Sequence, residues 1–558
     1  MDKTNVRELQ DVVIRFSGDS GDGMQLTGTL FSDTSALLGN GISTFPDYPA
    51  EIRAPQGTVA GVSGFQVHFG SHRELNPGDY CDVLVAMNPA ALKANRKWLK
   101  PGATVIIDGD SITEDHLKKA CFATLDPIAE LKLDEYNVVI PGITTMTRDA
   151  LRETGLDNKS VTKCKNMFAL GICFYLFDRP EAYAFKYIET KFAKKNPAIA
   201  EANKLAIQAG YNYAANTHQF ANTYTVAPAP LEKGTYRSIS GNVATAWGLC
   251  AAAEKAGLPL FCGSYPITPA TVILEELAKR KDLGVKTVQA EDEIAGICTA
   301  IGAAFAGNFA VTTTSGPGLS LKSEALGLAV MTELPLVVVD VQRGGPSTGL
   351  PTKTEQSDLA QALYGRNGEC PVIVVAASSP SDCFHYAFEA GRLAMEHMTP
   401  VILLTDGFIA NGSEPWRIPA MKDYPAITPP IVDEAPEGGF MPYVRNENLA
   451  RGWAFPGKTG LEHRVGGLEK DCVKGCISHD PSNHQKMVRT RAEKVAKAVD
   501  DIPAQAVWGA PEGDLLVVGW GGTRGHLQNA VDQMRAEGKR VSLCHFNYIN
   551  PLPHGVRE

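Results

Sequence analysis

Residues 1–200 alternate short apolar runs with longer amphipathic stretches. The apolar runs at 12–16, 82–88 and 105–109 predict strands, and the segment 24–39, which follows a glycine-rich turn, predicts a helix. Short buried strands that alternate with helices are typical of a mostly parallel sheet covered by helices on both faces. We therefore expect residues 1–200 to form an α/β domain.

The same alternation returns after a break in composition. Residues 201–230 are rich in Ala, Asn and Thr and end in VAPAPLEKG, which favours an extended linker between domains. Over residues 231–411, small-residue helical stretches alternate with strands that end in glycine-containing turns. This pattern predicts a second doubly wound α/β domain.

The last part of the chain loses this regularity. Residues 412–510 have weak periodicity and many prolines, so we expect an irregular arm that ends in a helix. Residues 511–558 predict one β-turn-α-β unit, which is less than a complete doubly wound domain. The expected fold class is α/β, with several doubly wound and mostly parallel sheets and an incomplete last domain.

Composition and charge exclude several classes of protein. Apolar residues make up 44% of the chain and charged residues 21%, which is ordinary for a folded protein. The net charge is -9 and no Lys/Arg cluster carries interleaved aromatics, so we expect no nucleic-acid partner. The N-terminus lacks the apolar run of a signal peptide, and no apolar run of about 18 residues occurs. These features predict a cytoplasmic protein without a membrane segment.

The twelve cysteines show no CxxC pair and no ferredoxin-type spacing, so we interpret most of them as buried thiols. One cluster leaves a metal site open as an alternative, and it consists of Cys472, Cys476, His479 and His484. Its CxxxC spacing has no clear second pair of ligands, so we favour the structural interpretation.

Several motifs that could carry chemistry follow predicted strands, where open α/β sheets bind their ligands. In SYPITPAT (264–271) the prolines fix the backbone and present the hydroxyls of Tyr265 and Thr268. The alternative is a proline-stiffened turn that opens a helix. We favour a functional role for this segment.

The motif AEDEIAG (290–296) places three carboxylates at the start of a predicted helix, where acids are often only favourable to the helix dipole. The following residues are so small and apolar that this helix is expected to pack on both sides. A carboxylate in the first turn of such a helix is then expected to lie near the interior of the protein. A partly buried carboxylate can exchange a proton near neutral pH, which makes it a candidate acid or base.

The segment VQRGGPSTGLPT (341–352) follows the most apolar predicted strand. Its arginine, Arg343, can grip a carboxylate with two parallel hydrogen bonds, and its glycines let the backbone approach a ligand. The alternative is a surface loop with an ion-paired arginine. Two further glycine motifs, at 17–25 and 519–525, are weaker, and the aspartates of the first would repel a pyrophosphate.

Four motifs in this order resemble the alpha subunit of 2-oxoacid:ferredoxin oxidoreductases, particularly the 2-oxoglutarate type (2-oxoglutarate synthase). They are SYPITPAT (264–271), AEDEIAG (290–296), TTTSGPGLSL (312–321) and QRGGPSTGLPTKTEQSDL (342–359). Upstream, RFSGDSGDGMQ and DYPAEIRAPQGTVAGVSGFQV resemble the gamma domain that some members carry in front of the alpha domains. The resemblance covers essentially the whole chain.

This resemblance implies oxidative decarboxylation of a 2-oxoacid with coenzyme A to an acyl-CoA, CO2 and reduced ferredoxin, reversible where carbon is fixed by a reductive TCA cycle. It also implies a beta subunit that holds the diphosphate of thiamine diphosphate, Mg2+ and a [4Fe-4S] cluster, in an (alpha-beta)2 assembly. The chain itself lacks cluster-type cysteines and a GDG followed by an Asn pair, so no metal site is expected in it.

The resemblance also implies roles for single residues. Glu293 is expected to be catalytic and to bind the aminopyrimidine of thiamine diphosphate, with Glu291 as the second choice. The other implied roles are substrate binding by Arg343, Thr268, Tyr265 and Thr352, cofactor contacts by Pro266 and Ile267, and coenzyme A contacts by Gly18, Gly21 and Gly23.

Three alternatives stay open at this point. The same chemistry could act on pyruvate or on branched-chain 2-oxoacids. A nicotinamide-dependent dehydrogenase could use the turn at 17–25, although no acidic residue is clearly placed to bind a ribose. A non-catalytic scaffold subunit would need neither Glu293 nor Arg343.

Overall fold

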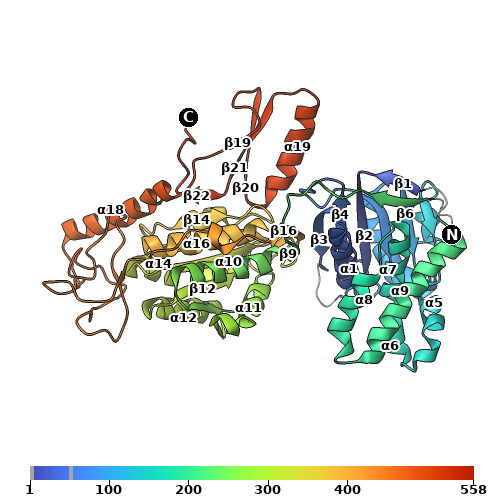
Figure 1. Ribbon diagram of the computed structural model, residues 1–558, viewed down its shortest axis with the longest axis horizontal. Coiled ribbons are helices and arrows are strands. Elements are labelled where there is room, and N and C mark those ends of the chain that lie inside the picture. Colours follow the sequence, from blue (N-terminus) through green and yellow to red (C-terminus); the bar gives the residue numbers. More distant parts are fainter. Residues whose placement is uncertain (1–5, 50–53, 221, 558) are drawn as a thin grey trace. The chain divides into compact units, whose positions relative to one another are not determined.

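The structure is a computed structural model that describes residues 6–49, 54–220 and 222–557 (Figure 1). The chain folds into two compact units. Unit 1 comprises residues 1–238 and 413–417, and unit 2 comprises residues 239–412 and 418–558. Each unit has its own sheet and its own hydrophobic core. No helix of the described residues is long and apolar enough to cross a membrane.

Unit 1 is built on a six-stranded mixed sheet. Its strands, in sheet order, are β3 (Gly41–Asp47), β4 (Val62–Gly70), β2 (Asp11–Asp19), β5 (Cys81–Ala86), β6 (Leu99–Ile107) and β7 (Asn137–Val139). The β2, β5, β6 and β7 strands run parallel, whereas β3 and β4 pair antiparallel at one edge. A separate parallel pair joins β1 (Val6–Leu9) to β8 (Thr223–Val226).

The helices of unit 1 cover this sheet, and four phenylalanines, Phe31, Phe69, Phe174 and Phe177, pack together in its core. The helices are α1 (Met24–Leu37), α2 (Pro89–Asn95), α3 (Glu114–Lys119), α4 (Pro127–Glu130), α5 (Ile143–Ala150), α6 (Asn158–Thr162), α7 (Lys165–Leu176), α8 (Ala182–Ile188) and α9 (Pro197–Thr217). Aromatic rings packed edge to face add stability beyond the area that they bury.

The segment expected to start a linker at residue 201 is a helix instead. Helix α9 runs on to Thr217, with Asn196 as its N-cap and Pro197 in its first turn. The alanines that indicated a loop are good helix formers. They also let α9 approach α7 so closely that a Cβ on Gly210 would lie 1.9 Å from the Phe168 carbonyl oxygen. Tertiary packing therefore decides the conformation of this segment.

Residues 413–417 also differ from the expectation of an irregular arm. They form strand β16 (Ser413–Arg417), which pairs with β9 (Tyr236–Ser240). The Ser413 amide donates to the Thr44 hydroxyl at 2.7 Å within unit 1. The chain thus returns to unit 1 for five residues.

Unit 2 contains a seven-stranded sheet in which six strands are parallel and the last is antiparallel. In sheet order the strands are β11 (Lys286–Gln289), β10 (Leu260–Ser264), β12 (Phe309–Thr314), β13 (Leu336–Gln342), β15 (Pro400–Asp406), β14 (Ile373–Ala376) and β22 (Tyr548–Asn550). The prediction of mostly parallel α/β sheets is confirmed.

Helices α12 and α14 share one core with the sheet of unit 2, into which Ile297, Leu326, Val338 and Ile402 are buried. Helices α10 and α16 pack against each other and against Phe309, so the sheet is covered by helices (Figure 1). The helices up to residue 411 are α10 (Gly241–Ala256), α11 (Thr271–Ala278), α12 (Glu293–Phe305), α13 (Gly316–Leu321), α14 (Ser323–Thr332), α15 (Leu359–Tyr364), α16 (Asp382–His397) and α17 (Gly407–Asn411).

Residues 418–510 form the expected irregular arm, which includes the short pair β17 (Ile431–Val432) and β18 (Trp453–Ala454) and ends in α18 (Pro481–Lys497). The arm is part of unit 2 and contacts helix α12, where the Trp453 indole donates to the Ala304 carbonyl at 3.0 Å. After it, β19 (Val507–Trp508), β21 (Val541–Phe546) and β20 (Leu515–Trp520) form a small sheet beside α19 (Arg524–Ala536).

Candidate active site

Four sequence motifs meet at one edge of the unit 2 sheet. Strands β11, β10, β12 and β13 are neighbours and parallel, and each is followed by one of these motifs. Because the carboxyl ends of parallel strands lie at the same edge, the motifs beginning at Ser264, Ala290, Thr312 and Gln342 come together there. The sheet order, which the sequence does not state, thus assembles one site.

Glu293 is the first residue of helix α12 and is half-buried. The preceding residue, Asp292, caps the helix by accepting a hydrogen bond from the Ala295 amide at 2.8 Å. The Glu293 side chain lies over Gly318, where an added Cβ would come within 2.9 Å of the Glu293 Cγ. A glycine at this position therefore leaves room for the glutamate. The carboxylate is held at a helix N-terminus, at the boundary between the interior and solvent.

Lys322, which the sequence analysis did not select, lies directly beside this glutamate. It is 0% exposed, and its Nζ donates to the Glu293 carbonyl oxygen at 2.7 Å. Burial lowers the pKa of Lys322 to about 8, and the charge of Glu293 opposes that effect. Lys322 directly follows TTTSGPGLSL. The sequence pattern identified this motif but not the charged residue that comes after it.

Arg343 follows strand β13 and is 7% exposed. Its Nη1 donates to the Thr268 carbonyl oxygen at 2.7 Å, and its buried Nε has no partner among the described residues. Burial lowers the pKa of Arg343, whereas the charges of Asp358 and Glu293 raise it. Glu293 and Arg343 are therefore close enough to interact electrostatically.

The segment SYPITPAT connects β10 to α11. Ser264 anchors its start, because the Ser264 hydroxyl lies 2.7 Å from the Thr313 hydroxyl and 2.9 Å from the Thr313 carbonyl oxygen. Tyr265, Pro266 and Ile267 are half-buried, and Thr268 is exposed. The backbone of Thr268, rather than its hydroxyl, makes the contact with Arg343. The predicted roles of these side chains stay predictions.

The loop after Arg343 folds back on itself. The Gly344 amide donates to the Lys353 carbonyl at 2.9 Å, and the Leu350 amide donates to the Gly344 carbonyl at 2.8 Å. Gly349 has φ +41°, and a Cβ there would lie 2.2 Å from the Gly344 carbonyl oxygen, so a glycine is required. Thr352 is half-buried within this closed loop.

Two buried carboxyl groups lie behind this loop and were not predicted. Asp340 is 0% exposed, and neither of its side-chain oxygens meets a hydrogen-bond donor among the described residues. Burial, and then the charge of Asp358, raise the pKa of Asp340 well above its ordinary range. Burial and a neighbouring carboxylate both disfavour the charged form, so the neutral form of Asp340 is favoured. The pair thus presents one negative charge toward Arg343.

The glycine motif of unit 1 is closely packed rather than open. An added Cβ on Gly18 would lie 2.8 Å from the Asp22 carboxylate, and one on Gly23 would lie 2.5 Å from the Asn166 amide nitrogen. Gly21 is less crowded, with its nearest neighbour at 3.6 Å. The predicted coenzyme A contacts of these glycines stay a prediction. In the second gamma-like motif, residues 50–53 lie outside the described residues.

The Cys472, Cys476, His479 and His484 cluster shows ordinary protein contacts. The His484 ring lies 2.8 Å from a Glu469 carboxylate oxygen, and the Cys472 amide donates to Asn483 at 2.9 Å. Within the described ranges, no group of three or more His, Cys, Asp or Glu side chains is arranged to hold a metal ion.

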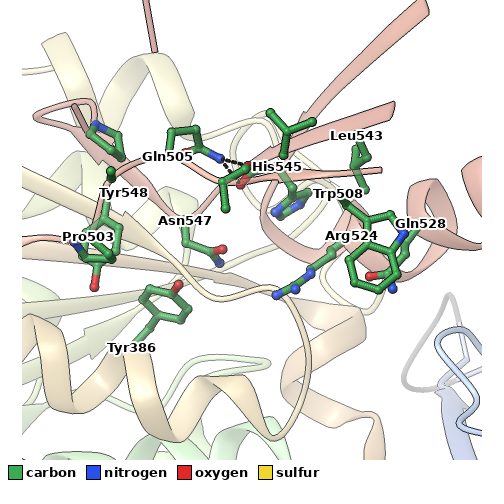
Figure 2. A pocket seen from close by; sticks show the side chains of 14 residues that line it. Tyr386, Pro503, Gln505, Trp508, Arg524, Gln528, Leu543, His545, Asn547 and Tyr548 are labelled. Atoms are coloured by element: carbon green, nitrogen blue, oxygen red, sulfur yellow. Dashed lines mark hydrogen bonds between the residues drawn. The ribbon is translucent and has the colours of Figure 1, made fainter. Parts of the chain in front are cut away.

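A separate cavity of about 330 Å³ lies in unit 2, between helix α16 and the small C-terminal sheet. Figure 2 shows Tyr386, Arg524 and Asn547 pointing toward the same space. Arg524 belongs to the glycine motif at 519–525, which ends at the start of α19. None of the predicted substrate or cofactor residues lines this cavity. It is distinct from the site at the strand ends.

Comparison with known proteins identifies the family. Residues 252–477 match the family described as pyruvate flavodoxin/ferredoxin oxidoreductase, thiamine diphosphate-binding, and residues 13–213 match pyruvate ferredoxin/flavodoxin oxidoreductase. The "2-oxoglutarate oxidoreductase subunit KorA" of Mycobacterium tuberculosis is 52% identical over 554 residues, which cover 99% of this chain and 84% of the relative. The alpha subunit of 2-oxoacid:ferredoxin oxidoreductase 1 of Aeropyrum pernix is 28% identical over 98% of this chain and 88% of the relative.

The solved structure of 2-oxoglutarate:ferredoxin oxidoreductase from Magnetococcus marinus, with 2-oxoglutarate, coenzyme A and succinyl-CoA bound, matches with a TM-score of 0.83 and 32% identity. The match covers 98% of this chain and 89% of that chain. The fold and the site thus define a subunit of a thiamine diphosphate-dependent oxidoreductase. The chain belongs to the 2-oxoacid:ferredoxin oxidoreductase family. Within this family it is similar over nearly its whole length to proteins of the 2-oxoglutarate type.

The residues at the strand ends suit thiamine diphosphate. Glu293 offers a half-buried carboxylate that can form a hydrogen bond with the aminopyrimidine ring, and Gly318 leaves the space beside it free of a side chain. The buried, unpartnered Nε of Arg343 is suited to an anion. The site therefore contains a carboxyl group and a guanidinium group that are chemically able to exchange a proton and to bind a carboxylate, respectively.

Proposed function

We propose that the chain is the alpha subunit of an enzyme that converts 2-oxoglutarate and coenzyme A to succinyl-CoA and CO2. The bond between the 2-oxo carbon and its carboxylate breaks, a thioester forms, and the electron pair released passes to two oxidised ferredoxins. The names of the M. tuberculosis relative and of the M. marinus complex support this substrate. The observation that carries the proposal is the meeting of Glu293 and Arg343 at one sheet edge.

In this proposal Glu293 binds the aminopyrimidine ring and exchanges a proton with it. The helix α12 dipole and the Asp292 cap hold the carboxylate in place. Pro266 and Ile267 are proposed to contact the same ring. Thiamine diphosphate supplies the electron sink for decarboxylation when it is bound. The work of this chain is to orient the reacting groups and to move the proton.

Arg343 is proposed to bind the 1-carboxylate of the substrate. Its hydrogen bond to the Thr268 carbonyl fixes the direction of the guanidinium, so the remaining N–H groups face the ligand. Tyr265, Thr268 and Thr352 are proposed to line the substrate, with Thr352 near its second carboxylate. The coenzyme A contacts proposed for Gly18, Gly21 and Gly23 belong to unit 1.

We assign the diphosphate, Mg2+ and the [4Fe-4S] cluster to a beta subunit, in an (alpha-beta)2 assembly that reduces ferredoxin. The name "subunit alpha" of the A. pernix relative supports a multi-subunit enzyme. The lack of cluster-type cysteine spacing in the sequence supports placing the cluster on a partner. A cytoplasmic location is part of this proposal.

The test is to purify the chain with its partner and to follow viologen dye reduction with coenzyme A and 2-oxoglutarate. Pyruvate and 2-oxoisovalerate are the comparison substrates. We expect turnover with 2-oxoglutarate to exceed that with the other two. Faster turnover with either comparison substrate would assign the enzyme to the other 2-oxoacid class. A nicotinamide-dependent reaction without viologen reduction would contradict the proposed function altogether.

Two variants test the residue roles. Glu293→Gln is expected to lower kcat about 100-fold or more, because it removes the proton-exchanging group. Arg343→Met is expected to raise KM for 2-oxoglutarate about 10- to 100-fold, because a charge-assisted, bidentate contact is lost. Arg152→Met, in an arginine whose side chain is 78% exposed, is the matched control and should change neither constant. Full activity of both site variants would indicate a scaffold subunit.

A further inference from the structure

Lys322 is a buried cation between two short helices. It ends α13, precedes α14, and is 0% exposed. Lysine is almost never fully buried unless it is paired. Its Nζ donates a hydrogen bond to the Glu293 carbonyl oxygen at 2.7 Å. This contact joins the α13–α14 junction to the first turn of α12.

The charges around Lys322 come mainly from α12. Glu293 has the largest electrostatic influence on the ammonium, and the other titratable groups that face it are Cys262 on β10 and Asp292 and Cys298 on or next to α12. Because burial lowers the pKa of Lys322 only to about 8, the ammonium is still charged at neutral pH. A positive charge is therefore buried beside the glutamate.

Glu293 in turn is close enough to two cations to raise the pKa of both Lys322 and Arg343. Helix α13 supplies two features that the glutamate needs. Gly318 leaves room for its side chain, and Lys322, one turn later, supplies the charge. The Lys322 amide donates to the Gly318 carbonyl at 3.0 Å, so both features are fixed by one helical turn.

We infer that Lys322 is a positioning residue for Glu293, an inference that rests on the proposed function. Its hydrogen bond fixes the first turn of α12, and its buried positive charge favours the ionised form of the carboxylate that is proposed to share a proton with the aminopyrimidine ring. A nearby cation makes a carboxylate release its proton at a lower pH. Removal of this charge is therefore expected to move the pH dependence of cofactor binding.

The experiment uses the complex of this chain with its partner, freed of cofactor and titrated with thiamine diphosphate and Mg2+ across pH 5.5–9. Tryptophan fluorescence reports the affinity, and the thermal midpoint of the cofactor-free complex reports stability. Lys322→Met removes the charge and the donor, Lys322→Gln keeps a donor without the charge, and Lys322→Arg keeps the charge. Lys494→Met is the matched control, because Lys494 is equally buried but pairs with Glu333 at 2.6 Å.

We expect Lys322→Met and Lys322→Gln to move the pH midpoint of cofactor affinity upward by about one unit, whereas Lys322→Arg does not. Lys494→Met should lower the thermal midpoint and leave the pH midpoint unchanged. Replacing a buried charge by an apolar side chain can leave stability unchanged or raise it. The thermal midpoint therefore reports packing, whereas the pH midpoint of cofactor affinity reports positioning of Glu293. If Lys322→Met does not fold, the Gln and Arg variants carry the same comparison.

The inference is overturned if the neutral variants bind the cofactor with the wild-type pH midpoint, whatever their stability. Failure of the proposed function gives a different result. In that case the wild-type complex does not bind thiamine diphosphate, or Glu293→Gln binds it as well as the wild type does.

Discussion

At the scale of single residues, the site depends on carboxyl groups in unlike surroundings. Glu293 lies at a helix N-terminus beside two cations, whereas Asp340 is buried in strand β13 next to another carboxyl group. The charge of Asp358 acts on both Asp340 and Arg343 and raises the pKa of each. The same functional group, a carboxyl, is thus an acid–base candidate at Glu293 and a group favoured in its neutral form at Asp340, because the surroundings differ.

Replacing Asp340 by Asn tests this assignment. Because the pKa of Asp340 is raised in the folded protein, folding favours its protonated carboxyl. The contribution of this group to stability is therefore present below pH 3.8, its ordinary pKa, and is lost as pH rises through the pKa of the folded state. An amide donates to Asp358 at every pH. We expect Asp340→Asn to raise the thermal midpoint at pH 8, by roughly 2–4 °C per kcal/mol gained, with little change at pH 4.

Calorimetry at several pH values checks this expectation. Asp149→Asn, in an exposed residue paired with Arg152, is the control that should show no such pH dependence. An effect of Asp340→Asn that is equal at all pH values would show that folding does not raise the pKa of Asp340.

At the scale of elements, α12 is the helix that delivers the glutamate. Its first turn is fixed from outside by Lys322 and from within by the Asp292 cap. Its last turn is fixed by the arm, because Trp453 donates to the Ala304 carbonyl. An N-cap satisfies an amide that would otherwise have no partner in the helix. Both ends of α12 are therefore fixed by hydrogen bonds, although Ile294 in its first turn is 50% exposed.

Removing the cap is expected to affect function more than stability. Asp292→Ala should cost about 1 kcal/mol of folding free energy. Because Glu293 is the next residue, the frayed turn should also weaken thiamine diphosphate binding. Isothermal titration of the complex measures that affinity.

Asp480→Ala is the matched control, since Asp480 caps α18 by accepting from the Asn483 amide at 2.7 Å. It should cost a similar free energy and leave cofactor affinity unchanged. Equal cofactor affinity in both variants would show that the first turn of α12 does not depend on its cap.

At the scale of the whole molecule, unit 2 is completed by the arm. Glu333, at the end of α14, accepts two hydrogen bonds from Arg445 at 2.6 and 2.7 Å and one from Lys494 at 2.6 Å. Arg451 adds contacts of 3.1 Å to the carbonyl oxygens of Thr332 and Glu333. Glu333 is 1% exposed, so one buried carboxylate holds the two basic side chains of the arm.

Glu333→Gln is expected to destabilise unit 2 by about 3–5 kcal/mol, because removal of one partner leaves buried charges uncompensated. The Arg445 and Lys494 cations lower the pKa of Glu333 far below its ordinary value of 4.5. Its stabilising contribution is therefore present above pH 4.5 and is lost as pH falls below it. Wild-type stability should accordingly fall more steeply on acidification than that of the variant.

Denaturant unfolding and limited proteolysis of residues 418–510 measure these effects. Glu201→Gln, which removes an exposed ion pair with Lys204, should cost less than about 1 kcal/mol. Unchanged proteolysis of the arm in Glu333→Gln would contradict an anchoring role for this carboxylate.

The amino-acid sequence predicted the elements that carry the motifs, because hydrophobic periodicity and turn residues act locally. The strand predicted at 12–16 lies within β2, the strand predicted at 82–88 overlaps β5, and the helix predicted at 24–39 contains α1, which ends at Leu37. The linker interpretation was wrong at 201–217, where the alanine-rich segment forms part of α9 and packs on α7. Composition alone does not distinguish such a helix from a linker.

The sequence by itself determined the four motifs, the charge of Glu293 and Arg343, and the family resemblance, since these depend only on residue type and order. Tertiary structure decided which strands are neighbours, and hence that Glu293, Arg343 and Thr268 share one site. It also buried Lys322 and Asp340, whose roles depend on the groups around them. Burial and proximity between distant residues arise from packing of the whole sheet, which no local pattern encodes.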